Sequence, residues 1–168
     1  MEARGRQALF TNIHYSPSTT SSMVKELSPK VLKQGEGELL RVLVDNITLK
    51  VDSADTGGRF IVVETNNEPG AGVPPHYHTR EDELFYIVEG EAEFMVDGKV
   101  FIAQAGDTVF GPRNVPHAYK FLQQTKMVVT ICPGGFEDMF REVHQMEDQS
   151  DLEAVVAIFN QYGVYLAE

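Results

Sequence analysis

The sequence has little cysteine and no long apolar run, and both shortages exclude whole classes of protein. Cys132 is the single cysteine among 168 residues, so a secreted scaffold held together by internal disulfides is excluded. The polar start Met1–Arg6 leads into no apolar segment of a signal peptide, and no window approaches the roughly 18 apolar residues of a membrane span. We therefore expect a cytoplasmic protein that does not enter membranes.

Basic side chains are also scarce. The chain has 14 lysines and arginines and 25 aspartates and glutamates, which gives a net charge of -11. Such a field repels phosphate backbones and anionic lipid surfaces, so neither nucleic acid nor membrane is an expected partner. It favours the approach of a metal cation. The length and the 42% of apolar residues suit one globular domain with extra residues at its ends.

Residues 1–35 are predicted to form an N-terminal arm, flexible in part because Ser16–Ser22 is a polar tract. Residues 36–133 have a different sequence pattern, in which short apolar or alternating runs are separated by turn residues. They are predicted to form one β-domain. The expected strands are Leu39–Val44, Ile47–Val51, Phe60–Thr65, Glu83–Val88, Glu91–Val96, Lys99–Ala103, Thr108–Phe110, His117–Phe121 and Met127–Ile131. Asp97-Gly98 is the strongest hairpin signal. This spacing predicts an antiparallel sandwich or barrel.

Residues 134–168 are predicted to be helical. The two expected helices carry the apolar stripes Phe136, Met139, Phe140, Val143 and Leu152, Val155, Val156, Phe159. Ser150 and Glu153 have the spacing of a capping box for the second helix, and Gly163 is its expected stop. Both stripes are interpreted as surfaces that pack on the barrel or on a second subunit rather than as a ligand site.

His76 and His78 are the first candidates for metal ligands. Side chains at i and i+2 of an extended strand point to the same face, so both imidazoles can reach one cation. Glu83 opens the next alternating run, and an inward carboxylate needs a partner such as a cation. Glu81 and Asp82 remain rival ligands if the register differs by one or two residues.

His117 is the fourth candidate, and it opens a later strand whose inner face also carries Tyr119 and Phe121. Closing the sheet into a barrel can bring this strand beside the first two. The remaining histidines, His14 and His144, are expected at the surface, and Cys132 is expected to be a small buried hydrophobe.

These residues resemble the two motifs of the cupin family. The first motif, G-x5-H-x-H-x4-E-x6-G, is filled completely, by Gly70, His76, His78, Glu83 and Gly90. The second, G-x5-P-x-G-x2-H-x3-N, is met at Gly106, Pro112 and His117. It departs at Asn114, which replaces a glycine, and at Phe121, which replaces an asparagine. Asparagine tolerates a left-handed backbone, whereas Phe121 is expected to alter the pocket wall.

The resemblance implies a mainly β fold, a double-stranded β-helix or jelly-roll barrel, followed by C-terminal helices like those of quercetinase-like cupins. It also implies a frequent homodimer and one divalent metal ion held by His76, His78, Glu83 and His117. Iron, manganese, nickel, zinc and copper all suit this ligand set. A six-coordinate ion would keep two positions for water, oxygen or substrate.

The leading hypothesis for function is a metal-dependent dioxygenase, an oxidoreductase in which Glu83 is both a ligand and a proton acceptor. A small aromatic or hydrophobic substrate is favoured because the expected pocket wall consists of Phe85, Ile87, Phe94, Tyr119, Phe121 and Met127. One alternative is a non-catalytic cupin that binds or senses a small molecule. Another is a sugar isomerase or epimerase. The basic residues that could bind a phosphate in such an enzyme are Arg41, Arg59, Arg113 and Lys126.

Overall fold

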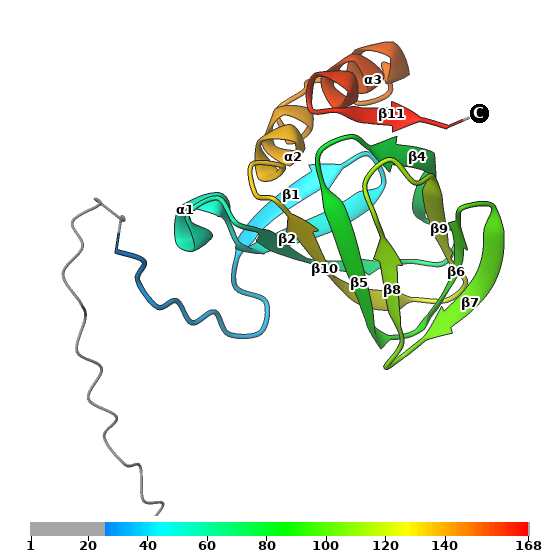
Figure 1. Ribbon diagram of the computed structural model, residues 1–168, viewed down its shortest axis with the longest axis horizontal. Coiled ribbons are helices and arrows are strands. Elements are labelled where there is room, and N and C mark those ends of the chain that lie inside the picture. Colours follow the sequence, from blue (N-terminus) through cyan, green and yellow to red (C-terminus); the bar gives the residue numbers. More distant parts are fainter. Residues whose placement is uncertain (1–25, 168) are drawn as a thin grey trace, which may run out of the picture.

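Two antiparallel sheets face each other as a β-barrel, and a helical segment covers one end of it (Figure 1). The computed structural model describes residues 26–167. The expectations for Ser16–Ser22 and His14 lie outside the described residues. The mainly β fold with C-terminal helices that the sequence predicts is confirmed.

The six-stranded sheet has the order β1-β2-β3-β10-β5-β8, and the five-stranded sheet has the order β11-β4-β9-β6-β7. The strands are β1 (Glu38–Val42), β2 (Asp45–Val51), β3 (Ile61–Asn67), β4 (Gly72–His78), β5 (Asp82–Glu89), β6 (Glu91–Val96), β7 (Lys99–Gln104), β8 (Thr108–Gly111), β9 (His117–Phe121), β10 (Thr125–Cys132) and β11 (Val164–Leu166). The helices are α1 (Ser53–Thr56), α2 (Glu137–His144) and α3 (Leu152–Gln161).

The β6–β7 hairpin shows how local sequence fixes the strands. Val96 pairs with Lys99, so Asp97 and Gly98 alone form the turn. Both residues have positive φ, 52° and 71°. That conformation matches the twist of the strands, and aspartate and glycine tolerate it.

Strand β5 alternates as expected on its inner side, where Glu83, Phe85 and Ile87 are buried. Its outer side carries Leu84 and Tyr86, which are 43% and 46% exposed. Cys132 differs from the sequence prediction. It is exposed, contrary to the expected burial, because alternation along β10 turns the last residue outward, where its Sγ donates to the Arg59 carbonyl.

The C-terminal segment returns to the barrel as a strand. After α3 the chain turns at Gly163, whose φ is 82°, and β11 pairs with β4. The cap of α3 is one residue later than predicted. Asp151 rather than Ser150 is the N-cap, because the Asp151 carboxylate accepts from the Ala154 N–H, whereas the Ser150 hydroxyl donates to Asp148.

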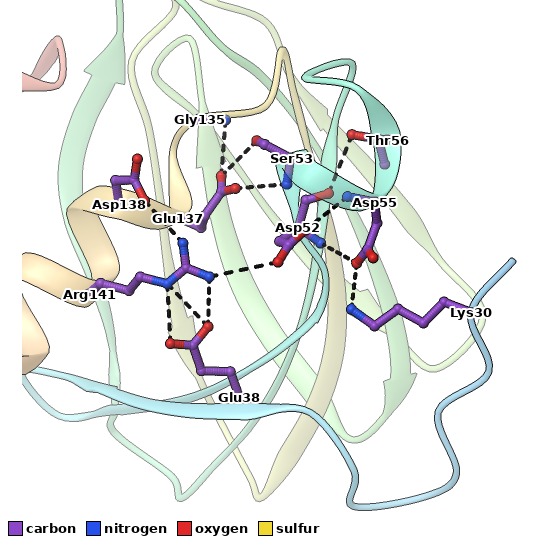
Figure 2. Close-up of polar contacts among 10 residues, drawn as sticks. All are labelled: Lys30, Glu38, Asp52, Ser53, Asp55, Thr56, Gly135, Glu137, Asp138 and Arg141. Carbon is purple, nitrogen blue, oxygen red and sulfur yellow. Dashed lines mark hydrogen bonds and ion pairs between the residues drawn. The ribbon is translucent and has the colours of Figure 1, made fainter. Parts of the chain in front are cut away.

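Figure 2 shows how the start of α2 is fastened to α1 and β1. The buried Glu137 carboxylate accepts three hydrogen bonds, from the Ser53 N–H, the Ser53 hydroxyl and the Gly135 N–H. One turn later, Arg141 forms an ion pair with Glu38 at 2.7 Å. Polar contacts that are distant in sequence therefore fix the position of α2 on the barrel.

The β1–β2 turn and the end of β1 are held to α2 and to the α2–α3 connection, which contains Gln149. The Leu43 N–H donates to Gln149, and the Gln149 amide donates to the carbonyls of Arg41 and Val143. His144 is exposed, as expected for a surface residue, and its Nδ1 accepts from the Arg41 N–H at 3.0 Å. Within residues 26–167, none of the helices combines the length and the apolar character needed to cross a membrane.

Candidate metal centre

Two strands of the five-stranded sheet place the three histidines together. His76 and His78 are alternate residues of β4, and both point into the barrel. Across the β4–β9 pair His76 lies opposite His117. The ring centroids of these two residues are 4.4 Å apart.

Glu83 reaches the same point from the facing sheet. It lies at the start of β5, where it pairs with Gly111 of β8 and Ile131 of β10. Its Oε2 is 2.9 Å from His117 Nε2 and 3.5 Å from His78 Nε2. One ligand atom from each of His76, His78, Glu83 and His117 lies within 4.8 Å of the others, and all four residues are buried, so the cluster can hold a metal ion.

Backbone carbonyls orient two of the imidazoles. His76 Nδ1 lies 2.9 Å from the Pro74 carbonyl, and His117 Nδ1 lies 3.1 Å from the Val115 carbonyl. A carbonyl can only accept, so Nδ1 carries a proton in each ring. In His76 this leaves the lone pair on Nε2, an arrangement that is common for histidines that bind metals. His117 Nε2 lies 2.9 Å from the Glu83 carboxylate, which also only accepts, so this nitrogen would lose a proton when a metal binds.

His78 tests whether the cluster suits a cation. Both of its ring nitrogens are buried, and among the described residues neither has a hydrogen-bond partner. Buried polar atoms are nearly always satisfied. A cation between His78, Glu83 and the other two imidazoles would bind the lone pair on His78 Nε2. Three imidazole nitrogens with one carboxylate oxygen suit a divalent transition metal.

The electrostatics give Glu83 and His76 the protonation states that bind a metal. For His117, burial opposes a proton, but the hydrogen bond with Glu83 outweighs burial and raises the pKa of this imidazole. Burial alone would raise the pKa of Glu83, but the neighbouring His78 and His117 outweigh it and lower that pKa to about 2. Burial lowers the pKa of His76 to about 4, and the nearby His117 adds to the effect. Glu83 is therefore a carboxylate and His76 a neutral imidazole at neutral pH, as coordination requires.

The rival carboxylates lie outside the cluster. Asp82 points to Arg113, with an ion pair of 2.7 Å whose hydrogen bond lowers the pKa of Asp82 to about 2. Glu81 is buried, but it faces the outer nitrogen of His78, with 3.6 Å between Oε2 and Nδ1. It forms no hydrogen bond with this ring among the described residues and is not part of the cluster.

The departure from the second motif at Asn114 has a clear structural reason. Asn114 has a φ of 63°, the left-handed conformation that usually favours glycine and that asparagine tolerates. Its N–H donates to the His78 carbonyl at 2.6 Å. The turn therefore also fixes the end of β4 that carries the histidines.

A cavity of about 260 Å³ adjoins the cluster. His76, His78 and Glu83 line it, whereas His117 lies behind them and is 1% exposed. Most of the wall is apolar and comes from both sheets, from the β1–β2 turn, and from α2, α3 and β11. Three wall residues, Val44, Leu152 and Leu166, are well exposed, which places them at the rim of the cavity.

The expected pocket residues separate into two groups. Phe85 and Tyr119 line the cavity. The other four do not, because they are wholly buried in the core: Ile87, Phe94, Phe121 and Met127. Phe121 packs under Tyr119, with 5.2 Å between ring centroids, so it contacts the pocket wall from behind.

Sequence reasoning missed the outer wall of the cavity. The two helical stripes pack on the barrel as expected, but Met139, Phe140, Val155 and Phe159 also line the cavity. Thr65 and Asp45 are two further lining residues that no motif includes. The available signal was weak, namely polar residues at positions where alternation turns β2 and β3 inward.

Asp45 should make stability depend on pH. Burial raises the pKa of Asp45 from 3.8 to about 6, so the folded state binds this proton more tightly than the unfolded chain does. The free energy of unfolding therefore falls as the pH rises from about 4 to about 6. Replacing Asp45 with asparagine should raise the free energy of unfolding by about 1–2 kcal/mol near neutral pH and by almost nothing below about pH 4. Urea denaturation at both pH values checks this, and an equal change at both would contradict it.

The fold and the cluster together define a class, a jelly-roll barrel with three histidines and a glutamate gathered on its inner wall. Residues 63–133 match the family model described as the cupin domain. The chain therefore contains a cupin domain.

A sequence relative agrees with this domain assignment, and solved structures agree with the fold. Quercetin 2,3-dioxygenase of Bacillus subtilis (strain 168) is 36% identical over 116 residues, which are 67% of this chain and 34% of that enzyme. The chain thus spans about a third of that relative's length. KdgF from Halomonas sp. has a TM-score of 0.60 at 18% identity and covers 66% of this chain and 99% of its own. An RmlC-like cupin from Shewanella frigidimarina NCIMB 400 has a TM-score of 0.58 at 22% identity, with 66% and 96% covered.

Proposed function

We propose that the protein is a metal-dependent dioxygenase that acts on a small aromatic or hydrophobic substrate. The observation that carries the proposal is the opening of the His76, His78 and Glu83 cluster directly onto an apolar cavity. The likeness to quercetin 2,3-dioxygenase supports it.

His76, His78, Glu83 and His117 would hold the metal, which when bound would supply open positions for dioxygen and a substrate oxygen. The chain contributes the orientation of the substrate and the exclusion of water. Phe85 and Tyr119 flank the cluster, with 5.9 Å between their ring centroids, and offer aromatic surface to a planar ligand.

Glu83 is proposed as the proton acceptor of the reaction. It lines the cavity, and it is ionised at neutral pH because its pKa is low. Burial raises the pKa of Tyr119 well above its ordinary value, so its phenol stays neutral beside the substrate and can donate a hydrogen bond. These two residues provide an acceptor and a donor next to the proposed reaction site.

The walls of the cavity argue against a sugar phosphate as substrate. None of the described residues that line it is lysine or arginine. Two of the basic residues considered from the sequence are engaged elsewhere, Arg113 with Asp82 and Lys126 with Glu64. An isomerase or epimerase for phosphorylated sugars would lack a partner for the phosphate.

Oxygen uptake tests the proposal. The apoprotein is reconstituted separately with Fe(II), Mn(II), Ni(II) and Cu(II) and assayed against a panel of flavonols and catechols. We expect uptake with at least one metal form and one substrate, and no uptake by the apoprotein. Absence of turnover in every combination would overturn the dioxygenase proposal. A ligand-induced rise in melting temperature without product would then favour a non-catalytic binding protein.

A further inference from the structure

The cavity has polar residues away from the metal cluster, and the first is Thr65. Its side chain is 3% exposed and lines the cavity, and its hydroxyl has no hydrogen-bond partner among the described residues. An unpaired buried hydroxyl destabilises a fold. A valine of the same shape would avoid this penalty, so the hydroxyl calls for an explanation in terms of a ligand.

The second polar residue is Asp45, a diagonal neighbour of Thr65. Ile47 of β2 pairs with Thr65 of β3, and Asp45 lies two residues before Ile47 on the same inner face. Asp45 Oδ1 accepts from the side-chain amide of Asn67 at 2.8 Å. That contact fixes the carboxyl and leaves Oδ2 as a further acceptor on a residue that lines the cavity.

The sheet register separates this pair from the metal cluster. Ile131 of β10 pairs with both Glu83 of β5 and Ile61 of β3, so Ile61 marks the level of the cluster on β3. Thr65 lies four residues further along that strand, which corresponds to roughly 13 Å. Between the two levels the wall includes the apolar residues Val63 and Val129.

We propose that Thr65 and Asp45 form a second polar subsite, which binds a hydroxyl group of the substrate at the end remote from the metal. The subsite supplies acceptors on both residues and a donor on Thr65, which suits an alcohol or a phenol. This inference rests on the proposed function and narrows its substrate class. The ligand is a small aromatic molecule with metal-binding oxygens at one end and a hydroxyl at the other.

The cavity volume limits the number of rings. A cavity of about 150 Å³ holds benzene, so about 260 Å³ suits one substituted ring or two fused rings. Two matched probes fit this description, 2,3-dihydroxynaphthalene and 2,3,6-trihydroxynaphthalene. They share the oxygens that would bind a metal and differ in the remote hydroxyl.

Equilibrium binding of the two probes to the metal-loaded protein tests the subsite, without oxygen so that no turnover is required. We expect the remote hydroxyl to tighten binding about tenfold in the unaltered protein. Thr65→Val should remove this preference and change the affinity for the dihydroxy probe less than twofold. Thr130→Val, the same substitution on the outer side of β10, is the control and should keep the preference.

The stability of Thr65→Val provides a second readout. Its melting temperature should equal or exceed that of the unaltered protein, because an unpaired hydroxyl is removed. Equal affinity of the unaltered protein for both probes, or a preference that survives in Thr65→Val, would overturn the subsite. Failure of oxygen uptake with a preserved hydroxyl preference would instead count against the dioxygenase proposal alone.

Discussion

His76→Ala and His117→Ala are each expected to abolish stoichiometric metal binding. Each change removes one of four buried donors whose ligand atoms lie within 4.8 Å of one another. Loss of a residue that merely orients a ligand typically lowers metal affinity 10–100-fold, so loss of a ligand should lower it by about 100-fold or more. Titration with Mn(II) or Zn(II), followed by elemental analysis after gel filtration, measures the change.

His144→Ala is the matched control, because His144 is exposed and belongs to α2 rather than to the cluster. It should keep one ion per chain. Retention of one ion per chain by His76→Ala or His117→Ala would contradict the ligand assignment. Circular dichroism of each variant establishes that it is folded before its metal content is compared.

Glu137→Ala is expected to lower the free energy of unfolding by about 3 kcal/mol. The substitution leaves the Ser53 N–H and the Gly135 N–H without their acceptor in a partly buried position. It should also weaken the binding of aromatic probes, because α2 supplies Met139 and Phe140 to the cavity wall. Metal binding should persist, since the four proposed ligands come from β4, β5 and β9.

Urea denaturation and probe titration measure these two effects. Glu147→Ala removes an exposed carboxylate from the α2–α3 connection and serves as the control, with an expected change below about 0.5 kcal/mol. If Glu137→Ala unfolds like the unaltered protein and binds probes with unchanged affinity, the proposed role of this network in holding the cavity wall is wrong.

The barrel was largely predictable because its signals are local. Alternation along β5 and the turn at Asp97-Gly98 depend on neighbouring residues only, and β6 and β9 have the bounds expected from the sequence. The cluster was predictable for a related reason. His76 and His78 share a face because of strand geometry alone. His117 is distant in sequence and comes close only through the pairing of β4 with β9, so the second cupin motif was needed to assign it to the same site.

The cavity could not be predicted in the same way. Phe85 and Ile87 lie on the same inner face of β5, yet of these two only Phe85 lines the cavity. The difference arises because the position of the opposite wall decides which inner side chains border the cavity. That wall comes from α2 and α3, whose position is set by contacts such as that of Glu137 with Ser53. No periodicity within one segment encodes such a contact.

The short elements were missed for a different physical reason. Strand β11 has three residues and acquires its regular structure from pairing with β4. Helix α1 has four residues and is held by Asp52 and Asp55, which cap it reciprocally. At the start of α3 two adjacent residues, Ser150 and Asp151, could both cap, and the structure uses the aspartate.

The most direct test of the central claim is an anomalous-difference map from a crystal of the metal-loaded protein, measured at the absorption edge of the metal. We expect one peak per chain, within bonding distance of His76, His78, Glu83 and His117, at roughly 2.0–2.2 Å from nitrogen and oxygen. A peak bound elsewhere, or no peak at these four residues in protein loaded with one equivalent of metal, would contradict that claim.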